Sequence, residues 1–472
     1  MSDAANGTPT GEQGVVISYT RAFADVSFLT FLEAMPIAPR IYWESGQVEI
    51  EFAGGGAAVE LYGTGAARFD QVQAQVERLF ANIVIDSTAP ESVQPRLFGG
   101  FAFREEAAAS TTAGDVWVAF PSAYLVLPRY QITRTHSQSG FQTWLTINRQ
   151  LMPLEHADSA LDSLEWEFES AARRVMMYAR DGGAERKTAY IESLDYPFNS
   201  AAWDAIITDA TARMRAHEFE KVVLARTADL RLSAPANLLA ALERMGAKYP
   251  HTYRFLIEPG AGRAFFGASP ELLAHVRAGV LHTAALAGSR RRGLTEADDQ
   301  VQADALMHSA KDRAEHQVVV DFLRERLQPF VTELEAADTP QILRLSNIQH
   351  LYTPVRAALQ PGVNALALVR ALHPTPALGG YPQAVSMEKV AQYEPVSRGW
   401  YAAPIGWIDA RGEAMFAVAI RAAVSSGKRV RMYAGAGIVA DSDPAKEWEE
   451  IELKFRPMME ALGVDMHERA ES

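Results

Sequence analysis

Two segments of the chain each carry a pair of carboxylates three residues apart. In the first segment the pair is Asp312 and Glu315, and near the C-terminus it is Glu447 and Glu450. Residues three or four apart share one face of a helix, so each helix would present two acids to one point. Four converging carboxylates need a cation, and a site of oxygen ligands suits Mg²⁺. The alternative is that these acids merely complement the dipoles of their helices.

A lysine and a glutamate are candidates for acid–base chemistry. Lys221 begins the apolar run Lys-Val-Val-Leu-Ala-Arg, where partial burial would favour a neutral amine that can act as a general base. Glu271 follows a Gly-Ala-Ser-Pro turn between apolar runs, where burial would raise its pKa and suit a general acid. In a displacement reaction, the base would activate the nucleophile and the acid would protonate the leaving group. The alternatives are a surface lysine that begins a strand and a glutamate that caps a helix or strand.

Several further residues are suited to binding an anion. Arg421 is a lone charge in an apolar run and could bind a carboxylate through both guanidinium nitrogens. Gly435 and Gly437 would let a ligand approach backbone N–H groups, although any tightly packed strand could also need them. Lys454 follows Glu450 by one helical turn. A ligand with one carboxylate bound to the metal and a second carboxylate bound to Arg421 and Lys454 would be a small dianion.

Composition excludes several classes of protein. The chain has 472 residues, a net charge of −13 and no cysteine. The charge argues against nucleic acid and anionic membranes as partners. The lack of cysteine excludes disulfides, thiol nucleophiles and cysteine-bound metals. Residues 1–14 are small and polar, which predicts a disordered lead-in rather than a signal peptide. No apolar stretch approaches the ~20 residues of a membrane span, so we expect a globular cytoplasmic protein.

The first half of the chain is predicted to be rich in strands. Helices are expected at about residues 69–80 and 161–178, and the polar, turn-rich stretch near residues 181–200 marks an internal boundary. The expected strands cover residues 47–52, 97–103, 116–120, 123–127 and 141–147. We therefore divide the chain into a disordered N-terminus (1–14), a strand-rich part (15–195), a catalytic part (196–464) and a C-terminal tail (465–472).

The second half alternates strands and helices. Helices are expected at residues 200–216, with Ser200 as N-cap, and at residues 238–248. Ser309 is the expected N-cap of the helix that carries the first carboxylate pair, and Pro444 lies in the first turn of the last helix. The expected strands cover residues 221–226, 227–232, 252–257 and 264–267. The buried stripe of the last helix is expected to be Trp448, Ile451, Phe455, Met458 and Leu462, which leaves Glu450 and Lys454 off the core face.

Residues 200–462 resemble the chorismate-utilising enzymes, a family that includes isochorismate, salicylate, anthranilate and aminodeoxychorismate synthases. Many motifs in the same order make this resemblance specific, whereas in the first half only Phe98-Gly-Gly-Phe-Ala-Phe is similar to a family motif. The matching motifs are Lys221-Val-Val-Leu-Ala-Arg, Gly267-Ala-Ser-Pro-Glu271-Leu-Leu, Ala287-Gly-Ser-Arg290, Lys311-Asp-Arg-Ala-Glu315-His, His350-Leu, His373-Pro-Thr-Pro-Ala377-Leu, Arg398-Gly-Trp-Tyr401, Ala419-Ile-Arg421 and Tyr433-Ala-Gly-Ala-Gly437.

The resemblance implies an α/β (α+β) fold of two stacked, mostly antiparallel sheets flanked by helices. It implies chorismate as substrate and Mg²⁺ as cofactor, with Glu315 and Glu450 as direct ligands and Asp312 and Glu447 as outer, water-mediated ones. The positions that match the family's substrate site are Gly288, Ser289, His350, Ala377, Leu378, Tyr401, Arg421, Gly435 and Lys454. By the same resemblance, Lys221 would deprotonate a water that attacks C2, and Glu271 would protonate the departing C4 hydroxyl.

Some positions separate the subfamilies. The amine-using synthases generally lack the lysine at position 221, and aminodeoxychorismate synthases can carry a lysine where this chain has Ala287. Both usually need a glutamine amidotransferase, which nothing in this chain resembles. Salicylate synthase is the main alternative, but such lyases tend to have a threonine where this chain has Ala377-Leu378. Tyr401 and His350 also occur in lyases and do not discriminate.

We therefore expect an isochorismate synthase, of the menaquinone type rather than the siderophore type, acting as a monomer. A non-catalytic chorismate-binding protein is the remaining alternative. Such a protein would be expected to have lost the base, the acid or a metal ligand, whereas Lys221, Glu271, Glu315 and Glu450 are all present.

Overall fold

The structure is a computed structural model, and it describes residues 14–46, 50–105, 115–137, 140–152, 155–182, 189–344 and 348–464. The C-terminal tail and all but the last residue of the predicted disordered N-terminus lie outside these residues, as do residues 47–49 of the first expected strand. Within the described part, no helix is both long enough and apolar enough to cross a membrane.

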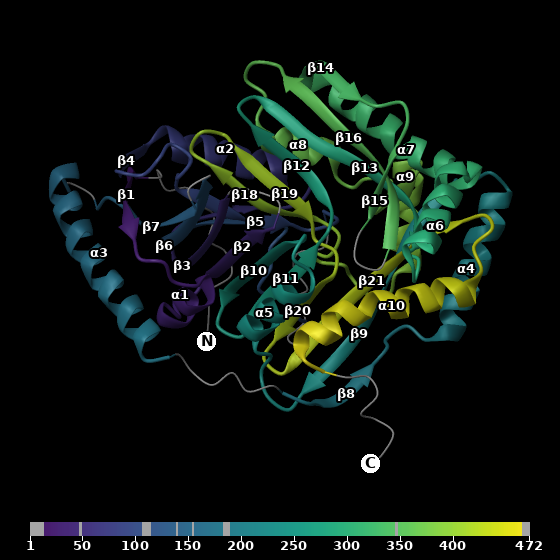
Figure 1. The fold of residues 1–472 in the computed structure, drawn as a ribbon, viewed down its shortest axis with the longest axis horizontal. Coiled ribbons are helices and arrows are strands. Elements are labelled where there is room, and N and C mark those ends of the chain that lie inside the picture. The colour runs from purple at the N-terminus through teal and green to yellow at the C-terminus, as the bar shows by residue number, and fades with distance from the viewer. Residues whose placement is uncertain are drawn as a thin grey trace.

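Strands and helices of the described residues are numbered along the chain (Figure 1). The strands are β1 (Val16–Phe23), β2 (Arg40–Ser45), β3 (Ile50–Gly63), β4 (Ile83–Ser87), β5 (Arg96–Phe101), β6 (Ala123–Ser137), β7 (Gly140–Gln150), β8 (Ile191–Asp195), β9 (Lys221–Leu232), β10 (Tyr253–Gly260), β11 (Arg263–Ser269), β12 (Leu272–Arg277), β13 (Val280–Arg291), β14 (Val331–Ala336), β15 (Gln341–Arg344), β16 (Ile348–Leu359), β17 (Gly380–Tyr381), β18 (Pro404–Asp409), β19 (Ala414–Val418), β20 (Ala422–Ser426) and β21 (Arg429–Val439). The helices are α1 (Phe28–Ala34), α2 (Arg68–Ala81), α3 (Ala157–Arg180), α4 (Ser200–Arg215), α5 (Leu238–Lys248), α6 (Glu296–His308), α7 (Ala310–Leu327), the 3₁₀ helix η1 (Gln328–Phe330), α8 (Ala365–Leu372), α9 (Gln383–Tyr393) and α10 (Pro444–Leu462).

The strands form two arms that meet at β6. This long strand pairs with β3 along its length, with β5 near its start and with β7 near its end. One arm runs β4-β1-β7-β6-β3-β2-β10-β11-β20-β21-β9, with β8 and β17 added to β9; the other runs β6-β5-β18-β19-β12-β13-β16, with β14 and β15 along β16. Among the described strands only β1 and β4 pair in parallel. The predicted α/β class and the mostly antiparallel pairing are confirmed. The two arms are joined by hydrogen bonds into one network of strands.

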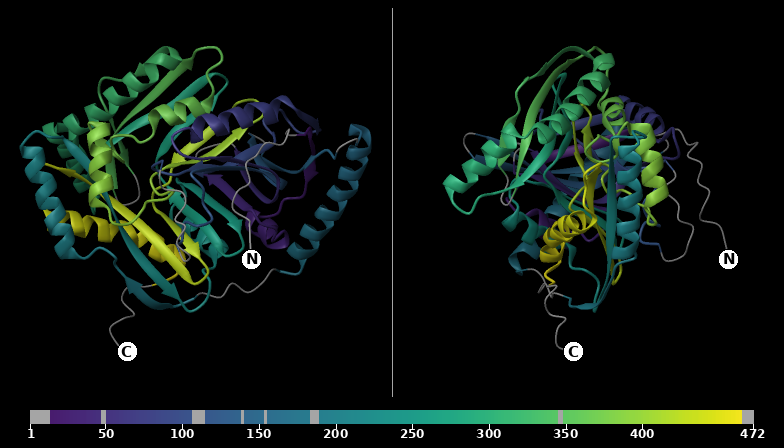
Figure 2. Two further views of the ribbon diagram at one scale, coloured as in Figure 1. Left: turned by 180° about the vertical axis from the view of Figure 1, so that it is seen from behind. Right: turned by 90° about the vertical axis from the view of Figure 1, so that its right-hand side faces the viewer.

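Large aromatic side chains fill the space between the two arms. Trp43 of β2 contacts Phe98 of β5, with ring centroids 5.9 Å apart, and Phe52 of β3 contacts Trp407 of β18 at 6.4 Å. All four side chains are buried. Helices cover the outside: α3 lies at one edge of the molecule and α4 at the opposite edge (Figures 1 and 2). The core therefore joins residues from both halves of the sequence.

Local predictions agree with the helices and fail at one strand. The prediction for α5, residues 238–248, is confirmed. The N-cap of α4 is Asn199, whose side chain accepts a hydrogen bond from the N–H of Ala202, so the prediction of Ser200 is wrong by one residue. The expected strand 116–120 is also wrong, because residues 116–119 form a turn. The Asp115 carboxylate accepts from the N–H of Trp117 and stabilises that turn.

The two helices that carry the carboxylate pairs begin as predicted. The Ser309 hydroxyl accepts from the N–H of Asp312 at the start of α7. Helix α10 has Pro444 in its first turn, and Trp448 in its predicted stripe is half-buried while the four other members are buried. Glu450 and Lys454 are exposed, as expected from their positions off this stripe. Both helices thus pack through one face and present polar residues on another.

Candidate active site

Lys221 is the first residue of β9 and makes an ion pair with α7. Its Nζ lies 2.5 Å from Oε1 of Glu315, and only 8 % of the lysine is exposed. A Cβ added to Gly437 on the neighbouring strand β21 would lie 2.9 Å from Cε of Lys221. Gly437 therefore makes room for the lysine side chain, whereas the sequence suggested that it makes room for a ligand.

Glu271 lies in the turn between β11 and β12. Its N–H donates to the hydroxyl of Ser269, 3.1 Å away. Burial raises the pKa of its carboxyl to about 7, and the nearby charge of Lys221 acts in the opposite direction. The raised pKa expected from the sequence is therefore present. The two candidate acid–base residues, fifty positions apart in the chain, lie close enough to influence each other.

Helix α7 approaches the carboxylates of α10 closely enough for the charge of Lys311 to act on Glu447. Burial raises the pKa of Glu447, with the charge of Glu450 adding to the rise, while the charges of Lys454 and of Lys311 on α7 oppose it. Glu450 Oε1 makes an ion pair with Lys454 Nζ at 2.7 Å. Each helix thus contributes one glutamate that is neutralised by a lysine: Glu315 on α7 and Glu450 on α10.

The predicted convergence of four carboxylates on one point is not observed. In the part of the chain that the structure describes, no three histidine, aspartate or glutamate side chains gather closely enough to hold a metal ion. The physical reason is that uncompensated carboxylates repel one another. In this structure their charge is balanced by lysines that reach in from β9 and from α10 itself.

A group of cations and a neutral histidine lies beside these carboxylates. Burial, together with the charges of Arg421 and Lys454, lowers the pKa of His350 on β16 to about 4, so the imidazole is neutral at pH 7. Lys454 Nζ donates to the carbonyl oxygen of Gly435 at 2.8 Å. Arg421 makes no ion pair with any carboxylate of the described residues. Its guanidinium is available to an anion.

Arg421 also has an uncommon backbone conformation. It lies between β19 and β20 with a φ of 49°, in the left-handed region that residues with a side chain rarely adopt. Such strain costs of order 1–3 kcal/mol and tends to occur at functional sites. Burial lowers the pKa of its guanidinium, so the protein holds a desolvated cation here at some cost in stability.

Gly288 forms a bulge that brings β13 onto α7. The pairing of β13 with β16 shifts between Ala287 and Ser289, and Gly288 has a φ of +70°. A Cβ on Gly288 would lie 3.1 Å from Cβ of Asp312, so a side chain would be both strained and crowded. Directly after the bulge, the Ser289 hydroxyl lies 2.9 Å from Nδ1 of His350.

Tyr401 closes the site on the side of β9 and β21. It is buried and stacks on Tyr433, with ring centroids 4.9 Å apart and an angle of 16°. Burial raises the pKa of Tyr401, and the charge of Glu271 contributes to the rise. A Cβ added to Gly435 would lie 3.6 Å from the hydroxyl oxygen of Tyr401. Tyr401 therefore connects the acid–base pair to the glycines of β21.

The predicted residues Ala377 and Leu378 lie in a turn before β17. The carbonyl oxygen of Leu378 accepts from Nη1 of Arg398 at 2.9 Å, and Arg398 Nη2 also donates to the carbonyl oxygen of Val223 on β9. Arg398 makes a buried ion pair with Glu394, 2.6 Å away. The sequence analysis identified the motif around residue 398, but it did not predict that Arg398 joins this turn to β9, the strand that begins at Lys221.

A contribution to the site from the first half of the chain was not predicted from the sequence. Trp117 Nε1 donates to the hydroxyl of Tyr433 at 2.7 Å, and Tyr433 in turn donates to the carbonyl oxygen of Ser397 at 2.9 Å. Gly399 can only be a glycine, because a Cβ there would lie 2.2 Å from the Trp117 ring. Trp117 thus supports the stack behind Tyr401.

Replacing Glu271 by glutamine should stabilise the protein at alkaline pH. The folded state raises the pKa of Glu271 from 4.5 to about 7. A buried acid with a raised pKa loses stability as the pH rises from its unfolded to its folded pKa, by up to about 3 kcal/mol here. The melting temperature of Glu271→Gln minus that of the wild type should be larger at pH 8 than at pH 4.5. An equal difference at both values would contradict a burial penalty on this carboxylate.

Comparisons with known proteins identify the family of this chain. The family described as chorismate binding enzyme matches residues 3–463. The chain is 37% identical over 424 residues to the salicylate biosynthesis isochorismate synthase of Pseudomonas aeruginosa, a match that covers 90% of this chain and 85% of the relative. It is 33% identical over 458 residues to isochorismate synthase MenF of Bacillus subtilis, covering 95% and 94% of the two chains.

A solved structure shows the same fold. The menaquinone-specific isochorismate synthase MenF of Escherichia coli superposes with a TM-score of 0.77 at 25% sequence identity, over 96% of this chain and 95% of the other. The family match spans nearly the whole chain, including the strand-rich first half, and the relatives align over most of their own length. This protein belongs to the family of chorismate-binding enzymes.

Proposed function

We propose that this enzyme is an isochorismate synthase, which converts chorismate reversibly to isochorismate. The observation that carries the proposal is the coupled pair of Lys221 and Glu271, a buried lysine and a carboxyl with a pKa of about 7. The relatives named isochorismate synthase, which align over most of their length, support the same activity.

The reaction replaces one hydroxyl group of the ring by another. Lys221 takes a proton from a water molecule whose oxygen forms a bond to C2. Glu271 gives its proton to the hydroxyl that leaves C4 as water, and both conjugated double bonds of the ring shift by one position as the bond to C2 forms and the bond from C4 breaks. A carboxyl with a pKa of about 7 is partly protonated at neutral pH, which suits this donor role. The site fixes water and ring together and so removes much of the entropic part of the barrier.

Mg²⁺ is the proposed cofactor, held by Glu315 and Glu450 directly and by Asp312 and Glu447 through water. The donor set fits, because Mg²⁺ is commonly bound through one or two carboxylates together with water and substrate oxygens, so a cage of three protein ligands is not required. When bound, the ion would act as a Lewis acid on the ring carboxylate of chorismate. Both direct ligands already pair with a cation in this structure.

The second carboxylate of chorismate is proposed to bind Arg421 and Lys454. Arg421 makes no ion pair among the described residues, and Lys454 is held in place by the carbonyl oxygen of Gly435. The neutral His350 and the hydroxyl of Ser289 add hydrogen-bonding groups beside these two cations. Tyr401, Ala377 and Leu378 complete the proposed substrate site on the side next to β9.

The proposal includes a monomeric cytoplasmic enzyme that needs no glutamine amidotransferase. A menaquinone-type enzyme is favoured, since the MenF relative aligns over nearly the whole of both chains. Salicylate synthase, in which isochorismate goes on to lose pyruvate, is the second candidate, because Tyr401, which also occurs in lyases, is close enough to Glu271 for that charge to raise the pKa of the tyrosine.

The test is a product analysis of purified protein incubated with chorismate and Mg²⁺ in the absence of ammonia. Isochorismate should accumulate without pyruvate, and EDTA should abolish the reaction. Salicylate with equimolar pyruvate would instead identify a lyase. A reaction that begins only when an ammonium salt is added would place the chain among the amine-using synthases, and no reaction under any of these conditions would refute the proposal.

Glu450→Gln should raise the Mg²⁺ concentration needed for half-maximal activity by about 10- to 100-fold, as expected when a metal ligand loses its charge. A titration of initial rate against Mg²⁺ measures this. The neighbouring Glu449→Gln is the matched control, because Glu449 is exposed on the same helix and has no proposed role. Equal Mg²⁺ dependence of the two variants would argue against Glu450 as a ligand.

A further inference from the structure

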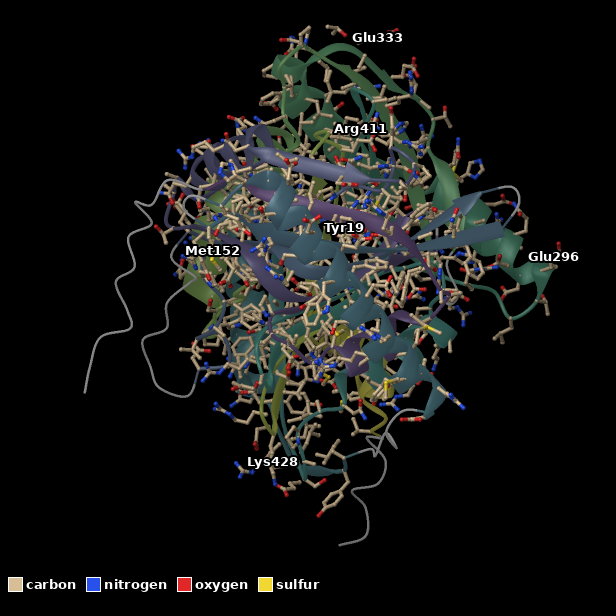
Figure 3. All side chains as sticks on the ribbon, turned by 90° about the vertical axis from the view of Figure 1, so that its left-hand side faces the viewer. Tyr19, Met152, Glu296, Glu333, Arg411 and Lys428 are labelled. Atoms are coloured by element: carbon tan, nitrogen blue, oxygen red, sulfur yellow. The ribbon has the colours of Figure 1, made fainter. Side chains whose placement is uncertain are left out.

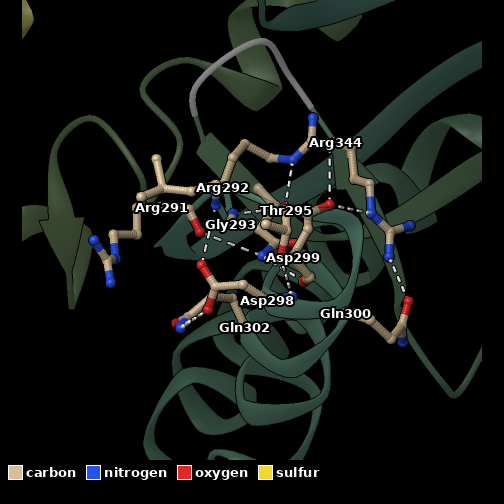
Figure 4. A network of polar contacts seen from close by, with 11 residues as sticks. Arg291, Arg292, Gly293, Thr295, Asp298, Asp299, Gln300, Gln302 and Arg344 are labelled. Atoms are coloured by element: carbon tan, nitrogen blue, oxygen red, sulfur yellow. Dashed lines mark hydrogen bonds and ion pairs between the residues drawn. The ribbon is translucent and has the colours of Figure 1, made fainter.

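Asp299 lies at the centre of a polar network beyond the proposed substrate site (Figure 4). It is in the first turn of α6, close to Glu296 at an outer edge of the molecule (Figure 3), yet only 6 % of Asp299 is exposed. Its carboxylate accepts from Nε and Nη2 of Arg292 at 2.7 and 2.9 Å and from Nε of Arg344 at 3.2 Å. The N–H of Gly293 adds a fourth bond at 2.9 Å.

These bonds join α6 to three strands. Arg292 and Gly293 directly follow β13, and Arg344 is the last residue of β15. Gln349 of β16 donates from Nε2 to the carbonyl oxygens of Asp299 and of Arg291, at 3.4 and 3.3 Å. One aspartate therefore contacts the end of β13, the end of β15 and the start of β16.

The strand ends that Asp299 holds carry part of the proposed substrate site. In the pairing of β13 with β16, the rung next to Arg290 and Gln349 is the rung of Ser289 and His350. The bulge at Gly288 separates these rungs from the rest of the ladder, and only three pairs follow it. A ladder end this short is stabilised by further contacts. On its other side β16 pairs with β15, Leu343 with His350 and Arg344 with Gln349. The Asp299 network joins all three strands at these last rungs.

The close fit of the network supports a specific role. A Cβ added to Gly293 would lie 2.0 Å from the backbone nitrogen of Asp299, so only glycine allows the chain to approach the start of α6. The hydrogen bonds to Arg292 and Gly293 lower the pKa of Asp299 to about 2, which keeps the carboxylate ionised throughout the physiological range.

We propose that Asp299 is a positioning residue: by clamping the ends of β13, β15 and β16, it holds Ser289 and His350 in the geometry that binds the substrate. This inference rests on the proposed function, because it assigns to that site a residue that does not itself touch the substrate. Loss of the clamp should therefore weaken binding of chorismate more than it slows the chemical step.

The test is steady-state kinetics of Asp299→Asn with chorismate and Mg²⁺. The KM should rise by about tenfold while kcat changes by less than about threefold, since small displacements of binding groups have effects of this size. In a background that carries both Ser289→Ala and His350→Ala, the same substitution should have a much smaller effect, because both groups being positioned are gone. Asp229→Asn is the matched control: Asp229 also binds an arginine, Arg431, through both oxygens at 2.6 Å, but at the far end of β9 from Lys221.

The outcomes separate the possible failures. A folded Asp299→Asn enzyme with a wild-type KM would overturn the inference, as would a full tenfold effect in the background that lacks both the Ser289 hydroxyl and the His350 imidazole. If Asp299→Asn does not fold, Arg344→Gln removes only the bond from β15, and it should still raise the KM; an unchanged KM there would overturn the inference. Wild-type protein with no activity on chorismate would refute the proposed function and this inference with it.

Discussion

Lys221→Ala is expected to lower kcat by about 10³-fold, the usual effect of removing a general base, while chorismate still binds. The lysine is buried and pairs with Glu315 at 2.5 Å, so alanine removes both the base and a charge. Steady-state turnover and calorimetric titration with chorismate measure the two quantities separately. A variant that keeps more than a tenth of the wild-type kcat would overturn the assignment of Lys221 as the base.

Lys221→Arg distinguishes the base from the charge. Arginine keeps a cation beside Glu315 but does not lose its proton at neutral pH, so it cannot deprotonate water. If Lys221 acts as the base, Lys221→Arg should be as inactive as Lys221→Ala. Substantial activity in the arginine variant alone would show that the positive charge beside Glu315 is what the reaction needs.

Glu271→Gln is expected to have a comparable effect, a decrease in kcat of about 10³-fold. Glutamine has nearly the same shape but cannot donate a proton to the leaving hydroxyl. The wild-type kcat should fall as the pH rises above about 7, because the folded pKa of Glu271 is about 7 and only the protonated form is a donor. The residual rate of Glu271→Gln should lack that decrease.

Two measurements make this second prediction specific. Glu271→Asp keeps an ionisable carboxyl and should retain more activity than the glutamine variant, with a decrease at alkaline pH. Thermal unfolding should show that Glu271→Gln is at least as stable as the wild type at pH 8, so that its inactivity does not come from unfolding. A glutamine variant with wild-type kcat would show that Glu271 is not the acid.

The expected gain in stability and loss of activity in Glu271→Gln have the same origin. Holding a carboxyl in a site that disfavours its ionised form costs folding free energy, and it provides a proton donor near neutral pH. The strained backbone and desolvated guanidinium of Arg421 are a second example of the same cost. Such sites are where stabilising substitutions most often reduce function.

Properties that depend on neighbouring residues were predictable from the sequence. The limits of α5, the cap at Ser309 and the exposed positions of Glu450 and Lys454 on α10 follow from helix periodicity and capping, which act over a few residues. The raised pKa of Glu271 was also predictable, because apolar residues on both sides of a turn indicate burial. Family motifs identified the chemistry without showing how the residues meet.

Contacts between distant residues were decided by the tertiary structure. A periodic pattern shows which face of a strand or helix is buried, but not which element covers it. The pairing of Lys221 with Glu315, the joining of the two arms at β6 and the support of Tyr433 by Trp117 connect residues far apart in the chain. The turn at residues 116–119 replaced an expected strand for the same reason, because its apolar residues pack against the second half rather than along a neighbouring strand. Asp299 is the clearest case: an acid in the first turn of a helix is ordinary in sequence, and only the arrival of three strand ends makes it the centre of a network.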